Sequence, residues 1–235
     1  MQLTWMDAKV GDWVVTPRSG KPVEINALWY NALLSMADFA RRLERPADVY
    51  EQLAEAARLG FRRFVLEGDG GLCDVLDGPQ GKDASLRPNQ ILAVSLTHSP
   101  LAAEAQAVVV SCVAGQLLSS FGLRSLAPAH PDYRSRYGGG VLERDGAYHQ
   151  GPVWAWLLGH YALAEFRVSG DAAAAQRRLD AIADHLGDAG LGTVSEIFDG
   201  EAPHTPRGAP AQAWSVACIL EAWCRLQAAR DPAGP

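Results

Sequence analysis

The sequence has few of the features that mark secreted, membrane-spanning or disulfide-bonded proteins. It contains four cysteines in 235 residues, and no two of them are spaced as C-x-x-C, so nothing predicts a disulfide framework or a cysteine metal site. No leader of charged and then apolar residues is present, nor any run of 18 apolar residues, which argues against secretion and membrane insertion. We therefore expect a cytoplasmic protein with reduced cysteines and no membrane partner.

Positive charge is also scarce. The chain has 21 lysines and arginines against 27 acidic residues, a formal net charge of −6, which gives no electrostatic footprint for nucleic acid. Hydrophobic residues make up 48% and charged residues 20%, a composition typical of soluble globular proteins and not of disordered ones. At this length we expect one domain with a sizeable core over residues 1–230, followed by a disordered tail at 231–235.

Apolar residues recur at helical spacing after Pro22 and predict an amphipathic helix. Proline suits the first turn of a helix, so Glu24 and Asn26 are expected to lie in that turn. There an acid gains about 0.3–1 kcal/mol from the helix dipole, which is the structural alternative to a binding role for Glu24. The apolar stripe consists of Ile25, Leu28, Trp29, Ala32, Met36, Phe39, Ala40 and Leu43.

The residues before and within this helix are typical of a carbohydrate site. Tryptophan rings suit the apolar faces of sugars, and carboxylates, amides and guanidinium groups bind pairs of hydroxyls. The ordered run of Thr4-Trp5-Met6-Asp7-Ala8, Thr16-Pro17-Arg18 and Gly20-Lys21-Pro22-Val23-Glu24-Ile25-Asn26-Ala27-Leu28-Trp29-Tyr30 resembles the C-terminal amylo-α-1,6-glucosidase domain of glycogen debranching enzymes. The resemblance extends from Leu3 to Trp223. One departure is Gly151-Pro152-Val153-Trp154-Ala155-Trp156, where the family usually has Gly-Thr-Val-Trp-Pro-Trp.

Loops rich in polar and aromatic residues repeatedly lead into apolar helices. Residues 85–90 precede a helix at 91–96, residues 148–151 precede one at 153–163, and the loop 190–208 precedes a last helix that begins at Pro210. In an (α/α) toroid the inner helices begin at a common rim, so such loops converge. The predicted fold class is therefore all-α, the C-terminal part of a six-hairpin glycosidase toroid with about seven helices, where the resembled family has twelve.

Hydrolysis of a glycosidic bond needs one carboxylic acid and one carboxylate on opposite sides of the bond. By resemblance, Asp7 matches the general acid of the family and Glu196 its general base. The structural alternatives are a loop cap for Asp7, a solvated loop acid for Glu196, and helix capping for the 87–90 segment. Residues predicted to bind the substrate are Trp5, Glu24, Asn26, Arg87, Asn89, Gln90, His149, Gln150, Trp154, Arg207, Gln212 and Trp214.

The resemblance implies inverting hydrolysis of α-1,6 branch linkages in glycogen or related α-glucans, with a glycogen limit dextrin as partner and no cofactor. Asp69, Asp74 and Asp77 could suggest a calcium loop, but their spacing does not match an EF-hand and we expect no metal. The alternative function is a truncated, inactive fragment that binds glucan or packs against the missing N-terminal half of the domain or against itself. A sugar epimerase is less favoured, because it needs paired histidines and His149 has no obvious partner.

Overall fold

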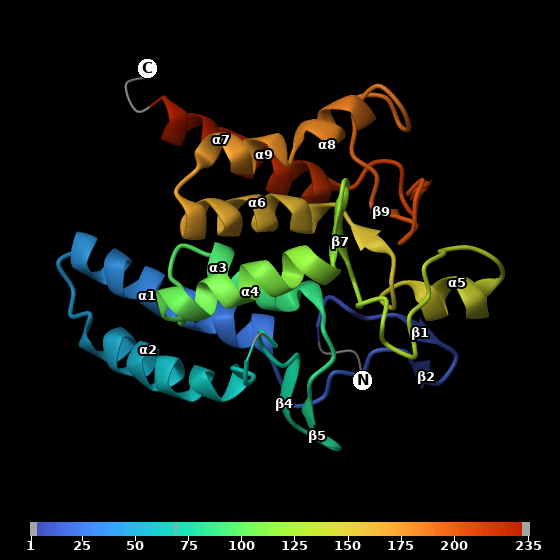
Figure 1. Cartoon of the computed structure of the whole chain (residues 1–235). Helices are drawn as coiled ribbons and strands as arrows, with labels where there is room; N and C mark the ends of the chain where they lie inside the picture. The colour runs from blue at the N-terminus through green and yellow to red at the C-terminus, as the bar shows by residue number, and fades with distance from the viewer. Residues whose placement is uncertain (1–3, 69, 232–235) are drawn as a thin grey trace.

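The computed structural model describes residues 4–68 and 70–231 (Figure 1), and its framework is helical, as predicted. In the first half of the chain, a hairpin of two long helices is followed by a short 3-10 segment and a compact helical turn, and then by a longer helix. These elements are α1 (Val23–Arg42), α2 (Asp48–Phe61), η1 (Arg62–Phe64), η2 (Pro88–Ile91), α3 (Leu92–Ser95) and α4 (Ala103–Gln116).

The second half of the chain adds α5 (Val141–Ala147), α6 (Trp156–Ser169), α7 (Ala172–Arg177), α8 (Asp180–His185) and α9 (Ala213–Arg230). An aspartate before a run of alanines predicts a helix cap at Asp171, and its side chain accepts a hydrogen bond from the Ala174 amide at 2.8 Å. Helix α6 packs against α3, α4 and α9 and lies inside the helical array (Figure 1). Within the described ranges, no helix combines the length and apolar character needed to cross a membrane.

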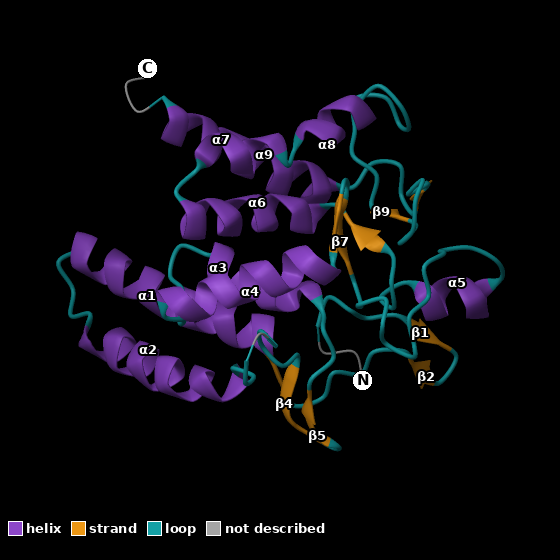
Figure 2. Cartoon of the chain, viewed as in Figure 1, coloured by secondary structure: helices purple, strands orange, loops and turns teal. Residues whose placement is uncertain are grey.

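Short antiparallel strands gather at one end of the helical array (Figure 2). They hold the loops that lead into the helices, and they form sheets of two, five and three strands with the orders β1-β2, β10-β9-β8-β7-β6 and β3-β4-β5. Their bounds are β1 (Lys9–Val10), β2 (Trp13–Val14), β3 (Lys21–Pro22), β4 (Val75–Gly78), β5 (Gly81–Asp83), β6 (Leu118–Ser119), β7 (Gly122–Arg124), β8 (Val153–Trp154), β9 (Ile197–Phe198) and β10 (Pro206–Arg207).

Several predicted helix ends differ from the observed ones. The apolar segment after Ser99-Pro100 predicts a helix that Gly122 closes. Helix α4 ends earlier, at Gln116, because the following residues pair as the hairpin β6–β7 and Arg124 N donates to the Leu117 carbonyl at 2.8 Å. The last helix begins at Ala213 and not at Pro210. Helix α5 was not predicted, because its seven residues follow a run of glycines and show no helical period.

The apolar stripe predicted for α1 exists, but it does not face the core. Leu28, Trp29 and Phe39 are 40%, 55% and 53% exposed, whereas the opposite face, with Ala27 and Leu33 among others, packs inward. Small residues on the inward face allow α2 and α3 to approach α1 closely, which periodicity alone does not reveal. Helix α9 has a similar exposed face, formed by Val216, Leu220 and Trp223.

Helices α1 and α9 lie on opposite sides of the helical array (Figure 1). The predicted inner helix at 153–163 is buried except at the partly exposed His160 and forms no open edge. The exposed apolar residues of the described chain include those of α1 and α9, and also Val49, Leu53 and Leu59 of α2.

Candidate active site

A buried group of charged side chains lies behind the N-terminal loop. Arg18 donates to both carboxylate oxygens of Glu24, at 2.5 and 2.7 Å, and to both of Asp74, at 2.5 and 2.9 Å. All three side chains are at most 2% exposed. Burial alone lowers the pKa of Arg18, but the adjacent Asp74 and Glu24 raise it above its ordinary value. Glu24 is therefore an internal ion-pair partner and not an exposed helix-dipole charge.

This charged group fixes Trp5. Asp74 Oδ1 accepts a hydrogen bond from Asn89 Nδ2 at 2.8 Å, and Asn89 Oδ1 accepts one from the Trp5 indole N–H, also at 2.8 Å. The predicted site residues Trp5 and Asn89 are thus brought together, and Asn89 connects the ring to the buried ions. Asp74, which sequence reasoning considered only for calcium, is part of the support of the site.

The backbone of the same loop is held by two threonines. Thr16 Oγ1 donates to the Met6 carbonyl at 2.9 Å, while Arg18 donates to Thr4 Oγ1 at 3.1 Å. Asp7 comes directly after these anchored residues, and its side chain is 64% exposed. The loop thus presents the carboxyl of Asp7 from a rigid base.

Trp5 is the centre of an aromatic cluster. Its ring meets His149, Trp154, Trp156 and Trp214 edge to face, with centroid separations of 5.1, 5.0, 5.2 and 6.0 Å. Edge-to-face pairs contribute about 0.5–1.5 kcal/mol each beyond their buried area. The cluster joins residues distant in sequence, and it includes Trp156, which sequence reasoning did not select.

His149 lies between the cluster and Asp7. Its Nε2 is 3.7 Å from Asp7 Oδ1, and the imidazole is fully buried. The interaction with His149 is the main reason why the pKa of Asp7 lies below its usual value, and burial opposes it. For His149 burial has the opposite effect, and it lowers the pKa of the imidazole below its ordinary value.

Three donors position the carboxylate of Glu196. The Tyr148 hydroxyl and Gln212 Nε2, the latter at 3.1 Å, donate to Oε1, and the Ala209 amide donates to Oε2 at 2.8 Å. Gly208 is required beside this carboxylate, because a Cβ there would lie 2.2 Å from Oε2. Burial and the bond to Glu196 raise the pKa of Tyr148 far above its ordinary value, so the phenol remains a donor.

The five-stranded sheet places Glu196 beside the segment that carries Tyr148 and His149. Glu196 directly precedes β9, which pairs with β8, so the 148–154 segment runs beside it. The Tyr148 ring packs against His149 with centroids 4.7 Å apart. A continuous series of contacts therefore leads from Asp7 through His149 and Tyr148 to Glu196.

Most of the other predicted residues form hydrogen bonds to other groups of the protein. Arg87 donates to the His149 carbonyl and to Gln150 Oε1, both at 2.7 Å. Gln90 Oε1 accepts from the Leu72 amide at 3.0 Å. Arg87 is the N-cap residue of η2 but makes no side-chain capping bond, so these polar groups support the loops from behind.

Two predicted residues lie outside these contacts. Asn26 donates to the carbonyl of Pro22, the N-cap residue of α1, at 2.8 Å. Arg207 pairs with Asp199 at 2.9 Å on the hairpin β9–β10 that follows Glu196.

Four residues that hold the site together were not among the predicted site residues: Arg18, Asp74, Tyr148 and Trp156. Arg18 lies within the recognised motif and Tyr148 is next to His149, so both had a sequence signal.

The loop acids considered for calcium have other partners. Asp74 is bound by Arg18, and the exposed Asp77 pairs with Lys21 and Arg63. Asp69 lies outside the described residues. Across the part of the chain that the structure describes, no group of three His, Cys, Asp or Glu side chains is placed to hold a metal ion.

Solved structures with the same fold include several glycosidases. A GH63 mannosylglycerate hydrolase from Thermus thermophilus aligns with a TM-score of 0.63 at 18% identity, over 87% of this chain and 45% of that one. A family 15 glucoamylase from Hypocrea jecorina aligns with a TM-score of 0.57 at 15% identity, over 99% of this chain and 45% of that one. At this identity the likeness shows the fold alone, that of the six-hairpin glycosidases.

Sequence comparison gives the family. The glycogen debranching enzyme of Saccharomyces cerevisiae is 26% identical to this chain over 93% of its length, and the match spans 18% of the yeast protein. The family model described as amylo-alpha-1,6-glucosidase matches residues 1–221. The chain therefore belongs to the amylo-alpha-1,6-glucosidase family.

Proposed function

We propose that this chain carries the acid and the base that hydrolyse α-1,6-glucosidic branch linkages in glycogen or a related α-glucan, with inversion. Asp7 would protonate the leaving oxygen and Glu196 would activate a water. The observation that carries the proposal is the placement of Glu196: three donors orient its carboxylate beside an aromatic cluster whose other end contacts Asp7 through His149. The tryptophans supply stacking surfaces for glucose rings.

The acid role places a requirement on Asp7. A general acid must carry a proton, and His149 holds the pKa of Asp7 below its usual value when the carboxyl is open to water. A glucan that covers this exposed side chain would desolvate it and raise its pKa. In other glycosidases an apolar pocket of the protein itself raises the pKa of the acid. Here the proposal requires the bound substrate to do so.

Glu196→Gln tests the base. The amide keeps the shape of the side chain but cannot take a proton from water, so we expect hydrolysis of a branched limit dextrin to fall by more than tenfold while binding changes by only a few-fold. Glu201→Gln, in the loop that joins β9 to β10, is the matched control and should keep its activity. Turnover above a tenth of the parent rate in Glu196→Gln would remove Glu196 from the base role.

Asp7→Asn tests the acid with two substrates. An α-glucosyl fluoride needs no protonation of its leaving group, so the variant should cleave it far better, relative to the parent, than it cleaves an α-1,6 linkage. Equal losses on the two substrates would argue against an acid role for Asp7.

The second candidate is a fragment that binds glucan or packs against a partner without turnover. The exposed apolar faces of α1 and α9 favour it, because a closed toroid would cover both. The chain spans less than half of the solved structures it matches. Retention of the chain on glycogen with no glucose released from a limit dextrin would support this function over hydrolysis.

A further inference from the structure

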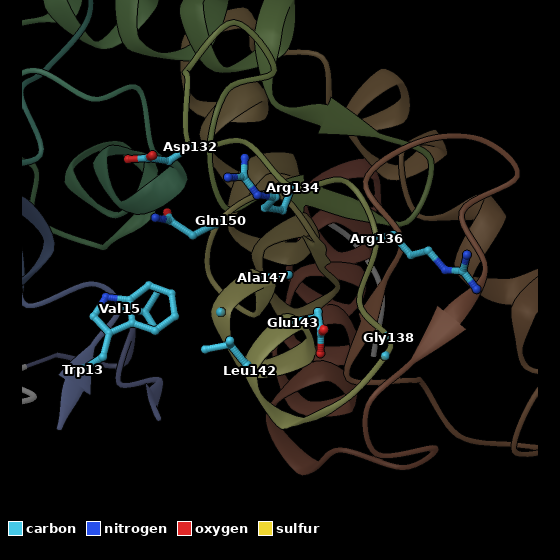
Figure 3. Close-up of a pocket in the computed structure, with 12 residues that line it drawn as sticks. Trp13, Val15, Asp132, Arg134, Arg136, Gly138, Leu142, Glu143, Ala147 and Gln150 are labelled. Carbon is cyan, nitrogen blue, oxygen red and sulfur yellow. The ribbon is translucent and has the colours of Figure 1, made fainter. Parts of the chain in front are cut away.

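An open cleft lies beside the acid pair. It has a volume of about 880 Å³ and lies between the β1–β2 hairpin, α5 and the 132–139 loop. Figure 3 shows Trp13 on one side of the cleft, Leu142 and Glu143 of α5 on another, and Gln150 between them and Asp132. As far as the described residues go, the lining includes neither Asp7 nor Glu196. It reaches Gln150, the residue after His149, so the cleft adjoins the site without being part of it.

Trp13 is exposed but held in position. Trp13 is 49% exposed, yet one edge of its indole contacts α5 at Gly146. A Cβ at Gly146 would lie 3.2 Å from two carbon atoms of the six-membered ring. The glycine therefore lets the hairpin approach α5, and a ring fixed in this way can stack on a ligand with little loss of side-chain entropy.

The charges that line the cleft balance. Arg134 and Arg136 are matched by Asp132 and Glu143, so the lining has no net charge that would select an anion or a cation. Guanidinium groups and carboxylates together can donate to and accept from adjacent hydroxyls. A neutral polyhydroxyl ligand fits this lining better than a phosphate or a carboxylate does.

A second cleft of about 700 Å³ continues the first. The two share Val15, Asp132 and Gln150, and the second extends to the turn between β4 and β5 at Pro79 and Gln80. Both volumes fall within the roughly 300–1,000 Å³ of small-molecule sites. Two such clefts that meet at shared residues suit a polymer that continues in both directions better than a compact ligand.

We propose that these two clefts form one groove that binds a linear α-glucan chain, with Trp13 as its stacking platform. The proposal rests on the proposed function for the class of ligand, since the chain that remains after a branch is removed is a linear α-1,4 glucan. The groove would hold this chain while the acid pair acts on the branch.

Binding to the full chain tests the groove independently of catalysis. Titration with maltohexaose and with maltose, followed by calorimetry, should give tighter binding for the longer ligand. Trp13→Ala should weaken maltohexaose binding at least fivefold, and Trp13→Tyr, which keeps a ring, should stay within about threefold of the parent. Trp223→Ala on α9, at 47% exposure in the parent, is the matched control and should bind as the parent does.

Asp132→Ala keeps the test decisive if Trp13→Ala fails to fold. This exposed residue lies where the clefts meet, so its loss should weaken maltohexaose binding at least threefold and leave maltose binding unchanged. No binding of maltohexaose at millimolar concentration, or equal binding by parent, Trp13→Ala and Asp132→Ala, would overturn the groove. Hydrolysis of α-glucosyl fluoride needs the base Glu196 but neither a general acid nor the groove, so a failure of the proposed catalysis is seen separately from a failure of the groove.

Discussion

The buried ion group behind the acid loop predicts that one carboxylate has an unusually large effect on stability. Arg18 and Arg87 provide two positive charges, and Glu24 and Asp74 two negative ones, all at low exposure. Asp74→Asn removes one negative charge and leaves a net positive charge in the interior. Breaking a buried pair in this way costs about 3–5 kcal/mol, because the remaining ion stays desolvated without its partner.

This cost is large compared with the stability of a domain. Native domains are stable by about 5–15 kcal/mol, so Asp74→Asn should remove roughly a fifth of the total in a very stable domain and more than half in a marginal one. With a urea dependence of about 2 kcal/mol per molar, the unfolding midpoint should fall by about 1.5–2.5 M. Far-UV circular dichroism during urea titration measures this midpoint.

The chain provides a matched control three residues away. Asp77 also pairs with two cations, Lys21 and Arg63, but all three side chains are largely in water, with 43% of the Asp77 side chain exposed. Surface pairs contribute little, so Asp77→Asn should leave the midpoint almost unchanged. Equal shifts of the midpoint by Asp74→Asn and Asp77→Asn would refute the reasoning. A cost of less than about 1 kcal/mol for Asp74→Asn would also show that the buried ions do not depend on this carboxylate.

Two further predictions concern pH and the open faces. Burial lowers the pKa of His160 to about 4, so protonation is resisted only in the folded state and stability should be lost as pH falls from about 6.5 to 4. We expect a loss of about 1–3 kcal/mol, allowing for the partial exposure of His160. His160→Gln should flatten this pH dependence of the urea midpoint. The same pH dependence in parent and variant would contradict the prediction. The exposed stripe on α1 predicts self-association, which light scattering at low micromolar concentration should detect. Replacing Leu28, Trp29 and Phe39 by serine should reduce it, replacing the exposed Val141 and Leu142 of α5 should not, and a monomeric parent would refute the prediction.

Local patterns determined much of the framework. The spacing of apolar residues after Pro22 predicted the helix that became α1, and the cap at Asp171 follows from a signal only a few residues long. The motif around Trp5 and Asp7, together with the loop around Glu196, was enough to predict the family and both candidate acids. The roles of these acids remain predictions.

The direction in which α1 faces was decided by tertiary structure. Two apolar stripes run along this helix, and the one with the larger residues, such as Trp29 and Phe39, is exposed. Alanines such as Ala27 and Ala37 allow neighbouring helices to pack on the other side. A hydrophobic period identifies a helix, but it does not say which stripe the rest of the chain covers.

The surroundings of the acids also depended on contacts between distant residues. Arg18 meets Asp74 from 56 positions away, and Trp5 meets Asn89 from 84 positions away. Glu196 is placed beside Tyr148 by the pairing of β8 with β9, two-residue strands with too few positions to show a sequence period. The sequence by itself therefore determined which residues were available for the site, while the desolvation, the ion pairing and the hydrogen-bond geometry that set their roles exist only after the chain has brought these segments together.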